Sequence, residues 1–282
     1  MDTLERAQDL RARIGVWRRD GACIGFVPTM GNLHAGHFSL IELARTRCDR
    51  VVTSVFVNPT QFGPREDFAS YPRTLDADRA SLAAHGCDVL FAPDVATMYP
   101  FGLDDGVRVE VPQLTQILEG TLRPGHFTGV ATVVAKLFNL VQPDIAVFGE
   151  KDYQQLLVIR RMTCDLCLPV EIVAAPTRRE ANGLAMSSRN QYLSAEERER
   201  AGIIHRTLRA MGEQVHSGRA HAKVEADARR TIEQAGLVPD YAVLRRAADL
   251  STPDLAERGG LIALIAAKLG GARLIDNRMI DQ

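Results

Sequence analysis

Two histidines three residues apart, His34 and His37, are the residues in this sequence whose type and spacing most clearly allow chemistry. Residues 28–37 run P-T-M-G-N-L-H-A-G-H, and an apolar run at residues 23–27 precedes them. An amphipathic run with helical spacing follows. α/β proteins commonly hold phosphate where a strand feeds a glycine-marked turn and a helix start. We therefore expect the unpaired first-turn amides and the helix dipole to face an anion, with both imidazoles reaching the same phosphate. The alternative is a solvated helix start with two surface histidines.

Two further segments place polar side chains just after apolar runs. Gln61 lies in N-P-T-Q-F-G (residues 58–63), after the run at 51–57, and offers both a donor and an acceptor to a polar ligand. Lys151 and Asp152 lie in G-E-K-D-Y-Q-Q (residues 149–155), after the run at 145–148, where an ammonium group and helix-start amides favour an anion. Asp152 suits a helix cap, a partner for Lys151 or a metal-bound water. Gln155 is expected one turn further on the same face.

Two more segments combine cations with hydroxyl groups or glycines. Residues 186–190 run M-S-S-R-N, and their two hydroxyls and forked guanidinium suit phosphate oxygens, although a capped turn has the same composition. Residues 123–129 run R-P-G-H-F-T-G and open a long predicted helix. Arg123 and His126 are weaker candidates for the same cleft.

The elements that must position these residues alternate along the first part of the chain. Strands are predicted at 23–27, 51–57, 88–92, 145–148 and 169–174. Helices are predicted at 3–20, from the H-x-G-H turn to about 48, and at 74–85, 126–142 and 152–163. This alternation predicts an α/β fold, a Rossmann-like doubly wound parallel sheet whose site lies at the carboxyl ends of the strands.

After Pro176 the pattern changes. Residues 177–194 are polar, and two helices are predicted at about 195–217 and 221–235. The chain then predicts an antiparallel pair or meander at 241–244, 261–266 and 273–275, with Gly270-Gly271 as a hairpin turn. We predict a Rossmann-like domain at 1–175 that binds nucleotide and a co-substrate, and a smaller α+β domain at 176–282 that closes over the site.

The composition excludes several classes of protein. The 282 residues are 46% hydrophobic with a net charge of −1, which argues against a partner with a nucleic-acid backbone. Five scattered cysteines predict reduced thiols in a cytoplasmic protein, and Cys164-x-x-Cys167 is better explained by a hydrophobic helix end than by a redox or zinc site. The charged start of the chain suggests no export, and no apolar run approaches a membrane span.

The H-x-G-H signature resembles that of the class I aminoacyl-tRNA synthetases and nucleotidylyltransferases. The full set of motifs, P-T-M-G-x-L-H-x-G-H, V-N-P-x-Q-F, R-P-G-H-F-x-G-V, G-x-K-D-x-x-Q and S-S-R-N, resembles the pantothenate synthetase family. These motifs occupy residues 28–37, 57–62, 123–130, 149–155 and 187–190. They span the first domain and the junction, and the C-terminal domain carries none of them.

The resemblance implies an ATP-dependent ligase that joins (R)-pantoate to β-alanine, with pantoate as the co-substrate bound by the domain at 1–175. Pantoate's carboxylate would attack the α-phosphorus of Mg-ATP to give pantoyl adenylate and pyrophosphate, and the β-alanine amine would then release AMP. A carboxylate is already ionised at neutral pH, so catalysis should consist mostly of positioning and electrostatic stabilisation. The resemblance also implies a cytoplasmic homodimer with no nucleic-acid or membrane partner, and Mg2+ held through ATP rather than by a protein cage.

The resemblance assigns roles to particular residues. It implies catalytic roles for His37 (the family's proton donor), His34, Lys151 and Arg189, and contacts with pantoate and β-alanine for Gln61 and Gln155. The residues it implies for ATP are Met30, Gly31, Asn32, Leu33, His34, Ala35, Gly36, His37, Gly149, Glu150, Lys151, Asp152, Arg178, Met186, Ser187, Ser188 and Arg189. Arg178 departs from the family, which usually has an apolar residue there, so its nucleotide contact is expected to be altered or made by backbone.

Two alternatives remain at this point. A nucleotidylyltransferase or a synthetase fragment shares H-x-G-H and a later phosphate loop, but the near-neutral charge and the two glutamine motifs argue against both. A catalytically silent nucleotide-binding module would not require His34, His37, Lys151 and Arg189 together.

Overall fold

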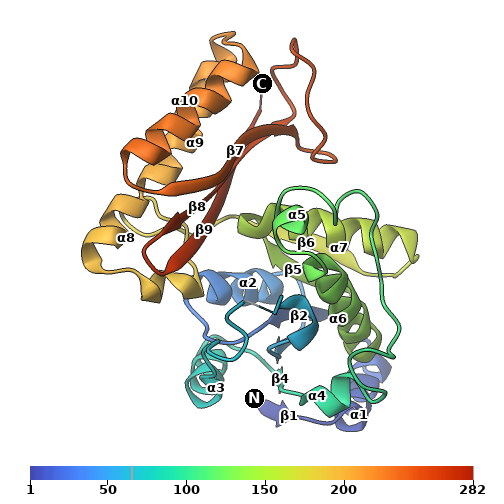
Figure 1. Cartoon of the computed structure of the whole chain (residues 1–282). Helices are drawn as coiled ribbons and strands as arrows, with labels where there is room; N and C mark the ends of the chain where they lie inside the picture. Colours follow the sequence, from blue (N-terminus) through green and yellow to red (C-terminus); the bar gives the residue numbers. More distant parts are fainter. Residues whose placement is uncertain (65, 282) are drawn as a thin grey trace. The chain divides into compact units, whose positions relative to one another are not determined.

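The computed structural model describes residues 1–64 and 66–281, which form two compact units (Figure 1). Unit 1 comprises residues 1–150 and 154–176, and unit 2 comprises residues 151–153 and 177–282. Lys151, Asp152 and Tyr153 thus group with the C-terminal part of the chain although they directly follow a strand of unit 1.

Unit 1 contains a six-stranded sheet in which every neighbouring pair is parallel. Its strands are β1 (Asp2–Leu4), β2 (Ile24–Thr29), β3 (Arg50–Val55), β4 (Val89–Phe91), β5 (Ile145–Gly149) and β6 (Glu171–Ala175). Their order is β1-β4-β3-β2-β5-β6. The predicted Rossmann-like parallel sheet is confirmed.

The helices of this part of the chain alternate with the strands. They are α1 (Ala7–Arg19), α2 (Ala35–Arg45), α3 (Leu75–Ala84), α4 (Val95–Met98), α5 (Glu119–Leu122), α6 (His126–Val141) and α7 (Tyr153–Asp165), with 3-10 turns η1 (Pro59–Gln61) and η2 (Glu150–Asp152). Strand β1 lies where the sequence predicted the start of a helix. Its three residues pair with β4 through backbone bonds, and a tripeptide carries no periodicity by which to recognise it.

Both faces of the sheet are covered, and β2 shows how. Phe26 packs its ring edge-on against Phe138 of α6, with 6.3 Å between ring centroids. Val27, the next residue, belongs to a buried cluster with Ile41 and Ala44 of α2. Successive side chains of a strand point to opposite faces, so β2 is buried from both sides, as its continuous apolar sequence requires.

The strand order reverses at β2. From β2 the chain proceeds through β3 and β4 on one side and continues through β5 and β6 on the other. In open α/β sheets, ligands bind beyond the carboxyl ends of the strands at such a switch point. The segments that leave β2 and β5 there are the H-x-G-H turn and the residues after Gly149.

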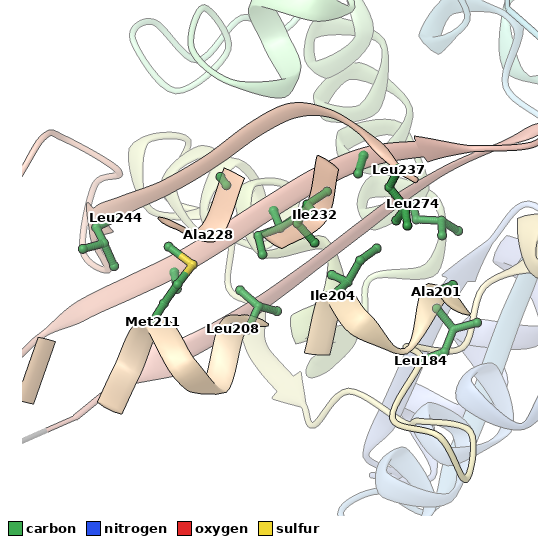
Figure 2. Packing of buried hydrophobic residues seen from close by; sticks show 14 of the residues in the cluster. Leu184, Ala201, Ile204, Leu208, Met211, Ala228, Ile232, Leu237, Leu244 and Leu274 are labelled. Carbon is green, nitrogen blue, oxygen red and sulfur yellow. The ribbon is translucent and has the colours of Figure 1, made fainter. Parts of the chain in front are cut away.

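Unit 2 is built on an antiparallel sheet of β7 (Val238–Arg246), β8 (Leu261–Leu269) and β9 (Ala272–Ile280), a meander joined at Gly270-Gly271 as predicted. The remaining elements are η3 (Ser188–Tyr192), α8 (Ala195–Ala201), α9 (Ile203–His216) and α10 (His221–Gln234). Figure 2 shows Leu208 and Met211 of α9 and Ile232 of α10 in the buried cluster beside the sheet. The single helix predicted at 195–217 is interrupted at Gly202.

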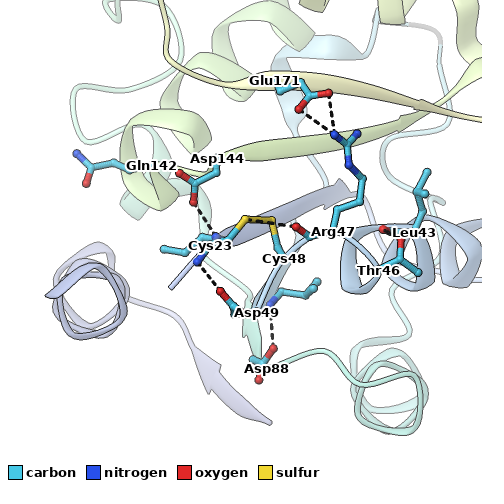
Figure 3. Close-up of a disulfide and its surroundings, with 12 residues drawn as sticks. Cys23, Leu43, Thr46, Arg47, Cys48, Asp49, Asp88, Gln142, Asp144 and Glu171 are labelled. Carbon is cyan, nitrogen blue, oxygen red and sulfur yellow. Dashed lines mark hydrogen bonds and ion pairs between the residues drawn. A yellow bond between two sulfur atoms is a disulfide. The ribbon is translucent and has the colours of Figure 1, made fainter. Parts of the chain in front are cut away.

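The structure corrects the prediction that all five cysteines are reduced. Cys23, just before β2, and Cys48, just after α2, form a disulfide with Cα atoms 4.8 Å apart (Figure 3). The two residues are 25 positions apart and meet only because α2 returns along the sheet, which composition does not reveal. Cys87, Cys164 and Cys167 are free thiols.

Two other features follow from the described part of the chain, residues 1–64 and 66–281. It contains no cluster of three or more His, Cys, Asp or Glu side chains suited to a metal ion. No helix in it has the length and apolarity to span a membrane.

Candidate active site

The turn after β2 is shaped by two residues with left-handed backbone conformation, Gly31 at φ +84° and Asn32 at φ +52°. Thr29 fixes its start, because its hydroxyl donates to the Ser54 carbonyl at 2.7 Å and accepts from the Gly31 amide at 3.2 Å. A Cβ at position 31 would lie 3.0 Å from both Asp78 Oδ2 and Val55 Cγ1. Glycine is thus required here for both conformation and space.

The two histidines cap helix α2 with their side chains. His34 Nδ1 accepts from the Gly36 amide at 3.1 Å, and His37 Nδ1 accepts from the His34 amide at 3.3 Å. The ring centroids are 4.1 Å apart. Because each Nδ1 acts as an acceptor, a neutral ring carries its proton on Nε2, the type of donor that binds a phosphate oxygen.

The expectation that unpaired amides of this turn face an anion is wrong for most of them. The amides of Asn32 and Leu33 donate to the Asp78 carboxylate, both at 2.9 Å. Other acceptors within the protein bind the amides of Gly31, His34, Gly36 and His37. The motif therefore differs from a glycine-rich loop that wraps phosphate with its backbone.

Gln61 lies at the end of η1 and is almost fully buried. Its Oε1 accepts from Asn58 Nδ2 at 3.1 Å, and its Nε2 donates to Met30 Sδ at 2.8 Å. Asn58 in turn accepts from the Tyr99 hydroxyl at 2.7 Å. Two residues predicted from the sequence, Gln61 and Met30, are thus in direct contact through their side chains.

Helix α6 packs backbone to backbone against η1. A Cβ at Gly129 would lie 2.4 Å from the Thr60 carbonyl oxygen and 2.7 Å from the Gln61 amide nitrogen. The Gly129 carbonyl also accepts from Asn58 Nδ2 at 3.1 Å. Gly129, the second glycine in R-P-G-H-F-x-G-V, is therefore the residue that lets α6 support Gln61.

Arg123 and His126 support Gln61 from its backbone side. Arg123 donates to both oxygens of Glu66, at 2.7 and 2.6 Å, and His126 Nδ1 lies 2.8 Å from the Gln61 carbonyl oxygen. Burial raises the pKa of the Glu66 carboxyl, but the bonds from Arg123 outweigh it and the pKa falls below its usual value. Burial and the Arg123 charge lower the pKa of His126 to about 4, so the ring is neutral at pH 7.

Lys151 lies in unit 2 and is fixed through its backbone. Its carbonyl accepts from Asn277 Nδ2 of β9 at 2.8 Å. Its ammonium group lies 3.7 Å from Asp152 Oδ1, so of the roles considered for Asp152 the structure shows that of ionic partner to Lys151. The Lys151 side chain is only 19% exposed.

The segment that contains Ser187, Ser188 and Arg189 follows a small hairpin at 178–186. The Met186 amide donates to the Arg178 carbonyl at 2.9 Å, which places these two predicted residues side by side through backbone. Arg179 donates to both oxygens of the buried Asp276, at 2.5 and 3.0 Å. Ser187 Oγ then accepts from the Arg189 amide at 3.2 Å and begins η3.

Neighbouring glutamines at the start of α7 differ in role. Gln154 is buried, and its side-chain amide bonds the Leu114 and Ile117 carbonyls and the Glu119 amide. Gln155 is half-buried, and together with Gly149 and Glu150 it belongs to unit 1. The candidate residues therefore form two groups, one in each unit.

The group in unit 1 contains Met30, Gly31, Asn32, Leu33, His34, Ala35, Gly36, His37, Gln61, Gly149, Glu150 and Gln155. The group in unit 2 contains Lys151, Asp152, Arg178, Met186, Ser187, Ser188 and Arg189.

Sequence reasoning missed several residues that hold these groups in place. Asp78 looked like an ordinary acidic residue in the first turn of a helix, and Asp276 and Asn277 lie in a strand without a motif. Only Gly129 carried a local signal, since a glycine inside a helical pattern implies a close approach.

Comparisons with known proteins identify the family to which this chain belongs. The model of the pantoate-beta-alanine ligase family matches residues 2–279. The chain belongs to that family. It is 59% identical over 278 residues to a pantothenate synthetase of Xylella fastidiosa strain M12, covering 98% of this chain and 99% of the relative. It is 56% identical over 277 residues to one from Xanthomonas axonopodis pv. citri strain 306, with the same coverage.

Solved structures agree with this family assignment. The pantothenate synthetase of Thermus thermophilus superposes with a TM-score of 0.93 at 48% identity, over 100% of both chains. The pantoate-beta-alanine ligase of Francisella tularensis, complexed with beta-gamma ATP and beta-alanine, gives 0.83 at 34% identity, over 99% of this chain and 98% of that one. The predicted ATP-dependent ligase that condenses pantoate with β-alanine is confirmed.

Proposed function

We propose that the residues predicted from the sequence carry out this ligation in two steps. In the first, an oxygen of pantoate's carboxylate attacks the α-phosphorus of ATP, so that a mixed carboxylic–phosphoric anhydride, pantoyl adenylate, forms and the broken P–O bond releases pyrophosphate. In the second, the β-alanine amine attacks the acyl carbon, AMP leaves with the electrons of the broken bond, and the amine loses a proton. The observation that carries the proposal is the pair of capping imidazoles at the start of α2, beyond the sheet's switch point.

His34 and His37 bind phosphate oxygens through their Nε2 donors in this proposal, and His37 is the proton donor. Their backbone caps support it, because they fix both rings at the positive end of the α2 dipole. Lys151, Ser187, Ser188 and Arg189 add charge and hydroxyl donors from unit 2. The remaining predicted ATP residues, Arg178 included, line the nucleotide.

Gln61 and Gln155 bind the acid substrates. The support for Gln61 is its buried, doubly bonded amide, which presents a defined orientation to a ligand's hydroxyl or carboxylate without placing a charge beside it. A preorganised neutral amide positions a carboxylate nucleophile without neutralising it.

Mg2+ enters as part of the substrate Mg-ATP. Magnesium retains several waters and is typically held by phosphates with one or two carboxylates, and Asp152 is the carboxylate beside the proposed phosphate residues. Bound there, Mg2+ would neutralise charge on the triphosphate.

We further propose that the chain acts in the cytoplasm as a homodimer, and that residues 176–282 close over the site in unit 1. A protein of near-zero net charge that uses a cytoplasmic nucleotide supports the location.

Release of pyrophosphate and AMP tests the proposal. With Mg-ATP and (R)-pantoate alone, we expect pantoate-dependent pyrophosphate in an amount close to that of the enzyme, and AMP only after β-alanine is added. Pyrophosphate release that does not depend on pantoate but increases with a phosphorylated co-substrate would indicate a nucleotidylyltransferase. ATP binding without turnover would indicate a silent module.

A further inference from the structure

Asp78 of α3 holds the H-x-G-H turn of unit 1 from outside the turn, through its side chain. Its Oδ2 accepts from the Asn32 amide at 2.9 Å and from the Thr74 hydroxyl at 3.0 Å. Its Oδ1 accepts from the Leu33 amide at 2.9 Å. Both oxygens are acceptors, which is the pattern of an ionised carboxylate. Only 3% of the residue is exposed.

The backbone around these amides forms an anion-binding concavity. Consecutive backbone N–H groups of a turn can point toward one place, a geometry that binds anions in many phosphate sites. Here the consecutive amides of Asn32 and Leu33 both point at the Asp78 carboxylate. In this chain a carboxylate of the protein occupies that point. The Asp78 carboxylate thus occupies the position that a bound phosphate occupies in a glycine-rich loop.

We propose that Asp78 is a built-in anion that holds the H-x-G-H turn in its binding conformation, so that ATP phosphates are bound by the His34 and His37 imidazoles rather than by the amides of residues 32 and 33. This inference deepens the proposed function and depends on its assignment of the two histidines to ATP. Asp78 is a positioning residue, because it acts through the backbone.

The geometry implies a specific consequence for the imidazoles. The Leu33 amide, fixed by Asp78, directly precedes His34, whose own amide is bound by His37 Nδ1. If the carboxylate is lost, two N–H groups of partly buried residues lose their acceptor, and the turn with φ of +84° and +52° loses the bonds that stabilise it. Both rings would then lose their shared orientation.

Replacement of Asp78 tests this, with Asp76 as the matched control. Asp76 lies in the same first turn of α3, but its side chain is 95% exposed and faces Arg79. In Asp78→Ala we expect kcat/KM for ATP to fall by about 10- to 100-fold while KM for β-alanine is unchanged, as expected for misplaced positioning groups. In Asp76→Ala all parameters should match wild type.

Chemical rescue separates the built-in anion from a general structural role. Sodium formate, a carboxylate small enough for the vacated volume, should restore at least several-fold of the lost kcat/KM in Asp78→Ala. Sodium chloride at equal ionic strength should not, and neither salt should raise the wild-type rate. A wild-type kcat/KM for ATP in folded Asp78→Ala, or a loss that formate leaves unchanged, would overturn the proposal.

Two further variants keep the test decisive if Asp78→Ala does not fold. Asp78→Asn keeps the shape but points an NH2 group at one donor, and Thr74→Val removes only the bond that orients Oδ2. We expect the same ATP-selective loss in both, smaller in Thr74→Val, and unchanged ATP kinetics in both would contradict the proposal. A His37→Ala variant with the wild-type rate would instead contradict the proposed function, whatever Asp78 does.

Discussion

The two groups of candidate residues are held in place by different means. In unit 1, the H-x-G-H turn is a compact segment whose backbone amides bind one buried carboxylate, Asp78, and whose histidines cap the helix they begin. In unit 2, two adjacent residues of β9 provide the support. Asn277 binds the Lys151 carbonyl, and Asp276 binds Arg179 in the hairpin that precedes Ser187–Arg189. The carboxylate that holds the turn of the first group lies 45 to 46 residues away in sequence, and the supports of the second group lie 97 and 126 residues away.

This difference shows how each group contributes to binding. A turn whose amides are bound by other groups of the protein presents two imidazoles in a fixed orientation. A lysine whose carbonyl is bound has its ammonium group on an anchored backbone, and an ammonium group acts on a phosphate as a point charge. In the proposed function, unit 1 therefore positions the phosphates and unit 2 adds positive charge.

The largest expected effect comes from breaking the support of unit 1 at Gly129. In Gly129→Ala the new methyl group would overlap the Thr60 carbonyl and displace Gln61, so we expect turnover to fall by about 100-fold. The matched control is Gly15→Ala in α1, where a Cβ meets only Arg19 Nη1 at 3.6 Å. Steady-state kinetics of both variants check this, and unchanged turnover in Gly129→Ala would contradict the role given to α6.

The corresponding variant in unit 2, which removes a support of Lys151, is Asn277→Ala. It removes the bond to the Lys151 carbonyl, and we expect a fall of roughly threefold to tenfold in the rate of pyrophosphate release, the size of one hydrogen bond. Met279→Ala, an exposed position on the same strand, should have no effect. A loss equal to that of Lys151→Ala would mean that the backbone anchor matters as much as the ammonium group.

The pH dependence of stability offers a further test of unit 1, because His126 has the pKa lowered to about 4 and lies in that unit. Because the pKa of His126 in the folded chain, about 4, lies below its ordinary 6.5, the unfolded chain binds the extra proton first as the pH falls. The free energy of unfolding should therefore decrease between pH 6.5 and about 4, by up to about 3 kcal/mol. The charged groups that influence His126 are Arg123, Glu66 and Glu119.

The fluorescence of Trp17, the single tryptophan, reports the unfolding of unit 1. Urea titrations across this pH range should show the decrease in wild type and a shallower one in His126→Gln. Equal slopes in the two proteins would contradict a neutral, buried His126.

The smallest effect on activity is expected from the disulfide. The structure predicts three titratable thiols in the denatured, unreduced protein, whereas the sequence predicted five. Counting thiols with a chromogenic reagent before and after reduction distinguishes the two. Cys23 and Cys48 lie at the far end of α2 from His34, so we expect unchanged turnover after reduction, and a large loss would show that the turn depends on this link.

The sequence was sufficient where function depends on contiguous residues. The parallel sheet, the meander and the turn after β2 follow from periodicity and glycine positions, and the motifs led to the family. The supports were not predictable, because Asp78, Asp276 and Asn277 act across long sequence separations and have ordinary residue types for their elements. The expectation of unpaired amides failed partly for the same reason, since the acceptor of the Asn32 and Leu33 amides comes from another helix. The amides of His34 and Gly36 are instead bound by the two imidazoles of the turn itself.

The most direct test of this division is a single-turnover measurement of pyrophosphate release with Mg-ATP and pantoate but no β-alanine. We predict that His37→Ala and Lys151→Ala each slow this step at least about tenfold while urea denaturation is unchanged. Lys223→Ala, an exposed lysine of unit 2, should match wild type. A wild-type rate in either active-site variant would remove that residue, and the contribution of its unit, from the reaction.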